Sequence, residues 1–268
     1  MRVVLGVVWV LLVVVLVQAG LALLLPLGVP VVNLAGAVVV AASALVAYAA
    51  FVRLVERRAV AELAAGPAPA ELGLGVLIGA LLFGATIGLI ALLGYYRIVS
   101  FNAWSAAVPA LADSLVAGVF EEILFRGLLF RIAQESLGTW LALLISALVF
   151  GLLHLANPNA TLIAGLAIAL EAGLMLAAAY LLTGRLWLSI GIHFAWNFTQ
   201  GGIFGAAVSG QSSTGIYNSV LQGPALLTGG DFGAEASVVA MVVCGLFGAY
   251  LVWRAWRAGK FVRPFWGK

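Results

Sequence analysis

The sequence predicts an all-α protein that crosses a membrane several times. Of its 268 residues, 65% are hydrophobic and only 9% are charged, whereas in soluble domains about half of the residues are apolar and about a quarter are charged. Apolar runs of about 20 residues, which as helices cross ~30 Å of hydrocarbon, recur along the whole chain. We therefore expect a single polytopic membrane domain over residues 1–268, without a soluble domain or an internal repeat.

Eight transmembrane helices are expected from the lengths of these apolar runs. Their ranges are 3–25, 31–52, 72–94, 106–127, 139–155, 160–182, 186–204 and 236–253. The first run has no convincing small-residue cleavage site, so we interpret it as a retained helix and not as a signal peptide. Between spans, 53–70 is expected to form a short cytoplasmic helix, and 205–237 an external loop that has no chemical signature.

The basic residues predict how these helices are oriented. With the N-terminus inside, all but one of the 13 Lys and Arg fall in inner segments, and only Arg97 lies outside. Because cytoplasmic loops are enriched in Lys and Arg, we expect an N-in, C-in protein. The inner basic residues are Arg2, Arg53, Arg57, Arg58, Arg126, Arg131, Arg185, Arg254, Arg257, Lys260, Arg263 and Lys268.

Composition and missing motifs exclude several kinds of function. The net charge of +3 is small, and the tail 253–268, in which basic and aromatic residues alternate, is expected to be an anchor at the membrane interface, so no nucleic-acid partner is expected. Cys244 is the only cysteine, which excludes a disulfide framework and a zinc-thiolate cluster, and we interpret it as a buried apolar thiol. The chain also lacks GxSxG, HExxH and GxGD motifs, which argues against serine, zincin and aspartyl protease sites.

Two adjacent glutamates, Glu121 and Glu122, interrupt the fourth span in the run SLVAGVFEEILFRGLLFR. A carboxylate at membrane depth costs about 3 kcal/mol or more and is a candidate functional group. Glu122 and Arg126 are four residues apart on one helix face and can pair, whereas Glu121 points about 100° away. Glu121 is therefore the available carboxylate, as a general base must be. A purely structural Glu–Arg pair between helices is the alternative, and it leaves Glu121 unexplained.

His154 is expected at the same membrane depth as Glu121. The fourth and fifth spans join around 135–139, and Glu121 and His154 each lie about sixteen residues, or about 24 Å of helix, from that turn. Arg131 and Glu135, near the turn, are expected to form a solvated pair. A lone histidine in an apolar run is commonly a hydrogen-bonded core residue, but one level with an available carboxylate is a catalytic candidate.

His193 and Asn197 share one face of the seventh span, in LSIGIHFAWNF. An asparagine amide can stabilise an oxyanion, and a structural role in bonding helix to helix remains open for both residues. Glu121, His154 and His193 are the candidate ligands if a divalent metal such as zinc is present. Two further intramembrane acids, Asp113 and Glu171, are secondary candidates for a functional role.

Three motifs resemble those of one known family. EEILFR (121–126), FGLLH (150–154) and HFAWN (193–197) resemble the EExxxR, FxxxH and HxxxN/D motifs of CAAX-processing and bacteriocin-processing intramembrane proteases, whose eukaryotic relatives are type II CAAX prenyl endopeptidases. The similarity covers about 105–200, the expected catalytic core. The resemblance implies that Glu121 and His154 activate a water molecule and that His193 and Asn197 stabilise the oxyanion. It also implies that Glu122 and Arg126 hold the site together.

The expected function is therefore that of an intramembrane endopeptidase with a polar cavity open to the membrane or the cytoplasm. The resemblance implies a peptide or protein substrate, with or without a lipid, in CAAX-type processing or peptide maturation. A prokaryotic cell membrane with its lipids is the expected location. The glutamate mechanism requires no cofactor, although the family is described as metalloproteases. A proton-coupled transporter, which would show two repeated hydropathy halves, and a non-catalytic scaffold or immunity protein are the alternatives.

Overall fold

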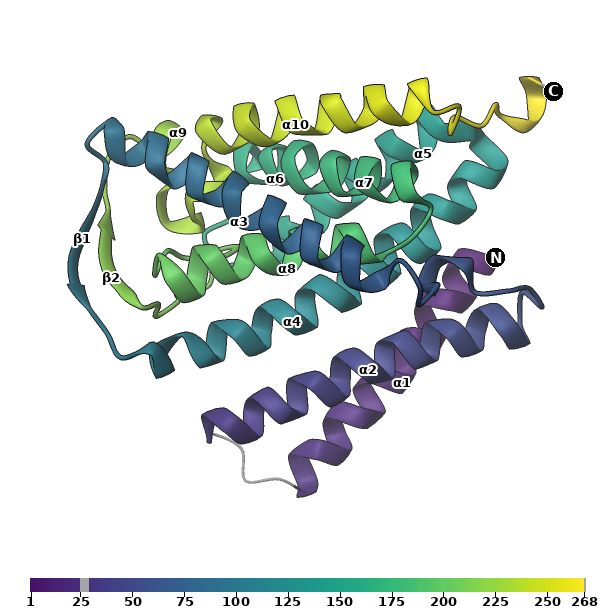
Figure 1. Cartoon of the computed structure of the whole chain (residues 1–268), viewed down its shortest axis with the longest axis horizontal. Coiled ribbons are helices and arrows are strands. Elements are labelled where there is room, and N and C mark those ends of the chain that lie inside the picture. Colours follow the sequence, from purple (N-terminus) through teal and green to yellow (C-terminus); the bar gives the residue numbers. More distant parts are fainter. Residues whose placement is uncertain (25–28, 268) are drawn as a thin grey trace.

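A computed structural model describes residues 1–24 and 29–267 and is almost entirely helical (Figure 1). Its α-helices are α1 (Arg2–Leu24), α2 (Pro30–Leu54), α3 (Ala68–Leu92), α4 (Val108–Glu122), α5 (Arg131–Leu153), α6 (Leu162–Ile168), α7 (Met175–Thr183), α8 (Trp187–Asn197), α9 (Ala225–Thr228) and α10 (Val238–Arg257). Three π-helical segments continue them, η3 (Ile123–Phe130), η5 (Ala169–Leu174) and η6 (Phe198–Ile203). The only strands among the described residues, β1 (Tyr96–Phe101) and β2 (Tyr217–Leu221), pair antiparallel.

The predicted all-α membrane architecture is confirmed by six segments that are long and apolar enough to cross a bilayer. Two features explain why this number is lower than the eight expected. Trp104–Ala156 contains both the fourth and the fifth predicted spans, because the helix is continuous through η3 and is interrupted only at Gly138. The seventh predicted span, α8 with η6, ends at Ile203 and is too short to be one of the six. The predicted end of the first span at residue 25 lies outside the described residues.

Gly138 divides the long helical segment into two arms. Its φ of 78° and ψ of 171° lie outside the helical region, and a positive φ of this kind is available to glycine at little cost. The next residue, Thr139, donates its backbone N–H to the carbonyl of Val262 at 3.0 Å. The bend lies within the predicted turn at 135–139, so the expectation of a helical hairpin there is confirmed.

Helix α8 packs between α3 and α4 and contacts α3 extensively (Figure 1). Glycines allow the close approach: a Cβ atom at Gly75 of α3 would lie 2.6 Å from the carbonyl oxygen of Leu188, and one at Gly79 would meet the carbonyl of Ile192. Small residues of this kind let membrane helices approach backbone to backbone. The position of α8 is therefore set by backbone contact on one side.

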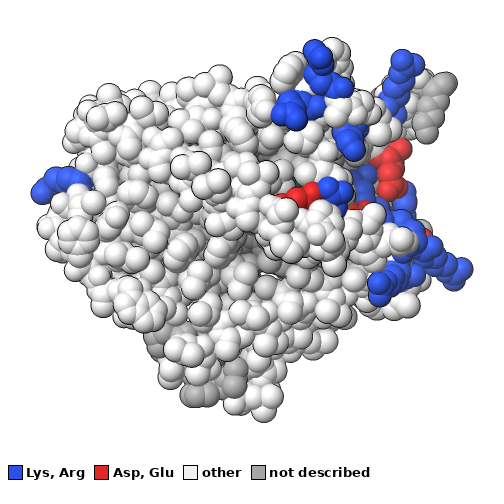
Figure 2. All heavy atoms as spheres, viewed as in Figure 1, with Lys and Arg blue, Asp and Glu red and all other residues white. Residues whose placement is uncertain are grey.

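Most charged side chains lie at one end of the molecule. Figure 2 shows Lys and Arg gathered at the end where both termini lie in Figure 1, with a single basic group at the opposite end. Arg97 belongs to β1, at that opposite end. This separation agrees with the prediction that both termini lie on one side of the membrane, although Arg126 is buried inside the bundle. Lys268 lies outside the described residues.

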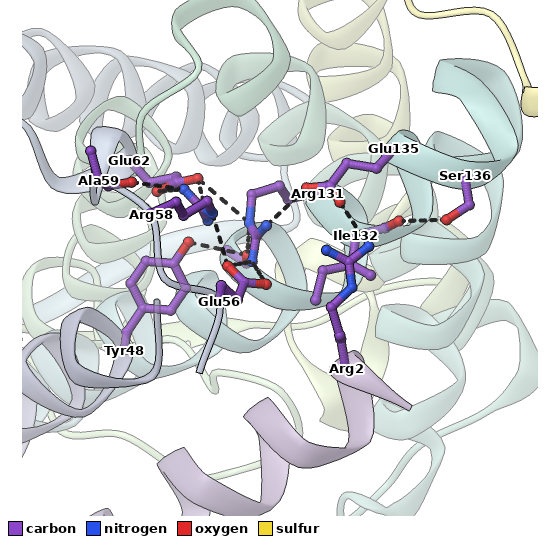
Figure 3. Close-up of polar contacts among 11 residues, drawn as sticks. Arg2, Tyr48, Glu56, Arg58, Ala59, Glu62, Arg131, Ile132, Glu135 and Ser136 are labelled. Atoms are coloured by element: carbon purple, nitrogen blue, oxygen red, sulfur yellow. Dashed lines mark hydrogen bonds and ion pairs between the residues drawn. The ribbon is translucent and has the colours of Figure 1, made fainter. Parts of the chain in front are cut away.

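At the basic end, a cluster of ion pairs around Arg131 connects the start of α5 to the segment between α2 and α3 (Figure 3). Arg131 forms the expected contact with Glu135 at 2.9 Å, but it also binds Glu56 at 2.8 Å and lies 3.5 Å from Glu62. The Arg131 side chain is only 8% exposed, so the prediction of a solvated pair is wrong for the arginine. Arg131 is instead a buried cation that three carboxylates surround.

The predicted short helix over 53–70 is also wrong. After α2 ends at Leu54, the chain turns and forms a single 3₁₀ turn, Ala61–Leu63, before α3 begins. The physical reason is that Glu56 and Glu62 both contact the buried Arg131. A regular helix that continued α2 would carry Glu62 away from this arginine. Burial raises the pKa of the Glu56 carboxyl, but hydrogen bonds and positive charge from Arg131 and Arg58 outweigh it and lower the pKa.

Candidate active site

A polar cavity of about 240 Å³ lies inside the bundle. Its walls include Glu121 from α4, His154 directly after α5, and both His193 and Asn197 from α8. These elements are far apart in sequence, and the cavity forms only where they meet. The structure thus brings together the four residues that the sequence singled out as catalytic candidates.

Glu122 lies at the centre of a buried ionic contact between helices. Its Oε1 accepts a hydrogen bond from Arg126 Nη1 at 2.6 Å, and Glu122 and Arg126 side chains are both 0% exposed. The same oxygen lies 2.9 Å from His193 Nδ1. Arg126 also donates from Nη2 to the carbonyls of Ala172 at 2.7 Å and Gly173 at 3.1 Å. The expected Glu122–Arg126 contact is present, and it extends to His193, which the sequence spacing did not indicate.

Glu121 has different surroundings from its neighbour. Its side chain is 26% exposed and lines the cavity. Its Oε2 lies 3.9 Å from His193 Nε2 and has no hydrogen-bond partner among the described residues. The expected division between a paired Glu122 and an available Glu121 is therefore present in the geometry.

A close approach of α4 to α8 brings Glu121 on α4 near His193 and Asn197 on α8. A Cβ atom at Gly118, one turn before the glutamates, would lie 3.0 Å from the backbone nitrogen of Phe194. The α-helical geometry then changes on both helices, because η3 begins directly after Glu122 and η6 directly after Asn197. Single-turn π-helical insertions occur frequently at functional sites, where they redirect side chains.

The hydrogen bonds of the two histidines determine which ring nitrogen carries a proton. His154 Nδ1 lies 2.8 Å from the carbonyl oxygen of Phe150, which can only accept, so Nδ1 is protonated and Nε2 of the neutral ring is an acceptor. His193 Nδ1 faces the carboxylate of Glu122, which also binds Arg126 and can only accept. His193 Nε2 can therefore donate a hydrogen bond only when the ring is doubly protonated.

The cavity extends from Glu121 toward the end of the molecule that bears β1 and β2. One stripe of α4 lines it, made of Ala110, Asp113, Ser114, Ala117 and Glu121, and α4 begins at the β1 end (Figure 1). If the basic end is cytoplasmic, the cavity lies toward the outer side. The expected access from the cytoplasm then disagrees with the positions of the lining residues, whereas access from the membrane does not.

Segment 205–237 contributes to this cavity, so the prediction of a loop without chemical features is wrong. Its residues in the cavity wall are Val208, Ser209, Gln211, Ser212 and Ser213. Glu235, which the sequence interpretation passed over, is 1% exposed and accepts a hydrogen bond from the backbone N–H of Ser209. The available signal was an acidic residue in a Gly- and Ala-rich stretch, directly before the last apolar run.

The secondary candidates lie in two different places. Asp113 lines the cavity that contains Glu121. Glu171, in η5, is buried and lines a smaller chamber beside it, together with Glu235 and Cys244. Cys244 is 0% exposed, as expected for a buried apolar thiol.

The candidate metal ligands do not form a metal site in this arrangement. Glu121, His154 and His193 line one cavity, but within the described residues no three His, Cys, Asp or Glu side chains are grouped to hold a metal ion. The Nδ1 atoms of His154 and His193 contact the Phe150 carbonyl and the Glu122 carboxylate, which leaves the two Nε2 atoms as the ring nitrogens that could bind a ligand. The candidate ligand set of Glu121, His154 and His193 therefore stays a prediction.

Comparison with known proteins gives one match. Residues 102–199 match the family model described as type II CAAX prenyl endopeptidase Rce1-like. This range includes Glu121, His154, His193 and Asn197. Neither the curated proteins nor the solved structures contain a match to the chain.

Proposed function

We propose that the chain is an intramembrane endopeptidase whose general base is Glu121, as the match of residues 102–199 to the type II CAAX prenyl endopeptidase Rce1-like family supports. The observation that carries this proposal is the single cavity of about 240 Å³ that Glu121, His154, His193 and Asn197 line. Its polar wall allows water to reach a peptide bond inside an otherwise apolar bundle.

Glu121 is the proposed base because its Oε2 has no hydrogen-bond partner within the described residues. It takes a proton from a water molecule while the water oxygen forms a bond to the carbonyl carbon of the peptide. The His154 ring offers Nε2 as a second acceptor that orients the water, since its Nδ1 donates to the carbonyl of Phe150. The electron pair of the carbonyl double bond moves to the oxygen, which becomes the oxyanion.

His193 and Asn197 are the proposed donors to the oxyanion. The Asn197 amide has no hydrogen-bond partner among the described side chains and lines the cavity. His193 donates from Nε2 as an imidazolium, and the adjacent Glu122 carboxylate at 2.9 Å from Nδ1 stabilises that charge. When the C–N bond breaks, Glu121 returns its proton to the leaving amine.

The proposed substrate is a peptide or protein segment that reaches the cavity from the bilayer. A groove of about 430 Å³, mostly apolar, runs between α1, α2 and α4. Asp113 lines both this groove and the catalytic cavity, so the two are adjacent. A lipid-modified C-terminal peptide, as in CAAX-type processing, or an unmodified peptide in maturation would fit this route. We expect a prokaryotic cell membrane as its location.

Cleavage of a peptide library by the purified full chain in a bilayer tests the proposal, with each peptide supplied with and without a prenyl group. Glu121→Gln is expected to lower kcat by about 10²–10⁴ and to leave the melting temperature unchanged. The neighbouring variant Glu122→Gln is the matched control. It leaves Arg126 without a counter-charge at 0% exposure, and should destabilise the fold by about 3–5 kcal/mol.

Three results would contradict parts of the proposal. Cleavage by Glu121→Gln at the wild-type rate would rule out this residue as the base. Loss of wild-type activity on chelation, restored by zinc, would replace the metal-free mechanism. A folded wild-type protein that cleaves no peptide in the library would favour a non-catalytic scaffold.

A further inference from the structure

A second chamber of about 30 Å³ adjoins the catalytic cavity. The two share four wall residues, His154, His193, Asn197 and Ser209. The chamber's other wall residues include Glu171, Glu235, Met175, Leu176, Ile192 and Cys244. It is thus an inner extension of the cavity, with an acidic pair and largely apolar walls.

The two acids of this chamber are buried and incompletely satisfied. Glu171 is 2% exposed and Glu235 is 1% exposed. Glu235 accepts a hydrogen bond from the backbone N–H of Ser209, whereas Oε2 of Glu171 has no partner among the described residues. Leaving a buried polar atom without a hydrogen bond costs about 1–3 kcal/mol, so a ligand that donates hydrogen bonds is favoured here.

The size of the chamber selects the ligand. A water molecule needs a cavity of about 10–15 Å³ and two to four polar partners. The chamber's 30 Å³ therefore accommodates about two waters, and it is too small for the side chain of a peptide substrate. Glu171, Glu235 and Asn197 supply the polar partners, and Met175, Leu176 and Ile192 form the apolar wall.

We propose that this inner chamber is a water-binding site that holds about two molecules between Glu171, Glu235 and Asn197. The role of this water, to supply peptide hydrolysis, rests on the proposed function. Each hydrolysis consumes one water, and the surrounding bilayer supplies none. Water held beside His193 and Asn197 replaces the consumed molecule, and the chamber refills from the larger polar cavity with which it shares four wall residues.

X-ray hydroxyl-radical footprinting of the full chain in detergent tests for this water independently of activity. Radicals formed from bound water oxidise the side chains next to it. Met175 is 2% exposed and Cys244 is 0% exposed, so bulk solvent does not reach them, yet both line the chamber. We expect both to be oxidised in the wild type, while Met241 outside the chamber serves as the dose reference.

Two kinds of variant sharpen the test. Glu171→Leu removes the acceptor and fills the chamber, so oxidation of Met175 and Cys244 should fall to background. Glu235→Leu should have the same effect, whereas Glu171→Gln keeps a polar side chain and should keep the labelling. Unfolding would raise the labelling, including that of Met241, and so cannot imitate the expected loss.

The kinetic readout separates this inference from the proposed function. Glu171→Leu should lower kcat and leave KM unchanged, because it affects water supply and not peptide binding. Unlabelled Met175 and Cys244 in the wild type, or equal labelling in Glu171→Leu, would overturn the water site. A labelled chamber in a protein that cleaves nothing would leave the water site standing and contradict the protease proposal alone.

Discussion

Glu121 and Glu122 are neighbours in the chain but have different chemical environments. Glu122 is 0% exposed and shares one oxygen between Arg126 and His193. Glu121 is 26% exposed, and its Oε2 has no hydrogen-bond partner among the described residues. The rotation of about 100° per residue along a helix turns one carboxylate toward the helix interface and the other toward the cavity. One residue can therefore be structural while the next is reactive.

Glu235 leads to a prediction about stability and pH. Burial raises its pKa to about 7, against the lowering effect of hydrogen bonds from Ser209 and Gln200. The folded protein therefore keeps a proton that the unfolded chain releases near pH 4.5. The contribution to the free energy of unfolding is present at low pH and is lost as pH rises through about 7.

Thermal unfolding in detergent between pH 4.5 and 8 measures this effect. The stability of the wild type relative to Glu235→Gln should fall with rising pH, by on the order of 3 kcal/mol, since one pH unit is worth about 1.4 kcal/mol. The Gln variant cancels the contributions of all other titrating groups. Parallel pH curves for the two proteins would show that Glu235 titrates normally.

Helix α8 has close backbone contacts on two sides. Glycines of α3 allow backbone contact on one side, and Gly118 of α4 allows it on the other. His193 and Asn197 are carried by this helix, so their distance from Glu121 depends on both contacts. Helix packing thus determines the geometry of the site.

Gly79→Ala tests this dependence. The added Cβ would meet the carbonyl oxygen of Ile192 and the side chain of Ala195 at 3.0 Å, so α8 must shift. We expect a loss of about 1–3 kcal/mol of stability, as for other overpacked interfaces, together with reduced peptide cleavage. Gly84→Ala, on the same helix but with nothing within 4 Å, is the matched control and should melt at or above the wild-type temperature. Equal melting temperatures for the two variants would contradict the close contact.

For the molecule as a whole, charge and cavity lie toward opposite ends. The basic residues gather where the termini lie (Figure 2), and the cavity extends toward β1 and β2. An N-in orientation therefore requires access to the cavity from the outer side or from the bilayer. Access from the cytoplasm requires the reverse orientation.

Labelling of single cysteines decides between these orientations. In a Cys244→Ser background, a membrane-impermeant maleimide should label Arg97→Cys on intact cells, because β1 is expected outside. Arg257→Cys, after the last span, should be labelled only once the membrane is permeabilised. The reverse pattern would contradict the N-in prediction and would restore cytoplasmic access to the cavity.

Features that depend on local sequence were predictable. The apolar runs matched the helices to within a few residues, and Gly138 lies in the predicted turn. Spacing along one helix correctly paired Glu122 with Arg126. Each of these features depends on residues that are close together in the chain, so helical periodicity and hydropathy are sufficient to predict it.

Contacts between distant segments needed the tertiary structure. Glu122 and His193 are 71 residues apart in sequence, and the pairing of Arg131 with Glu56 replaced an expected helix by a turn. Glu235 joins the inner chamber only because segment 205–237 folds back over the bundle. The chain's composition and periodicity specify which segments enter the membrane and which polar residues go with them. The packing of the helices decides that Glu122 is paired with Arg126 and His193 while Glu121 remains available, because burial and pairing depend on the neighbouring helices.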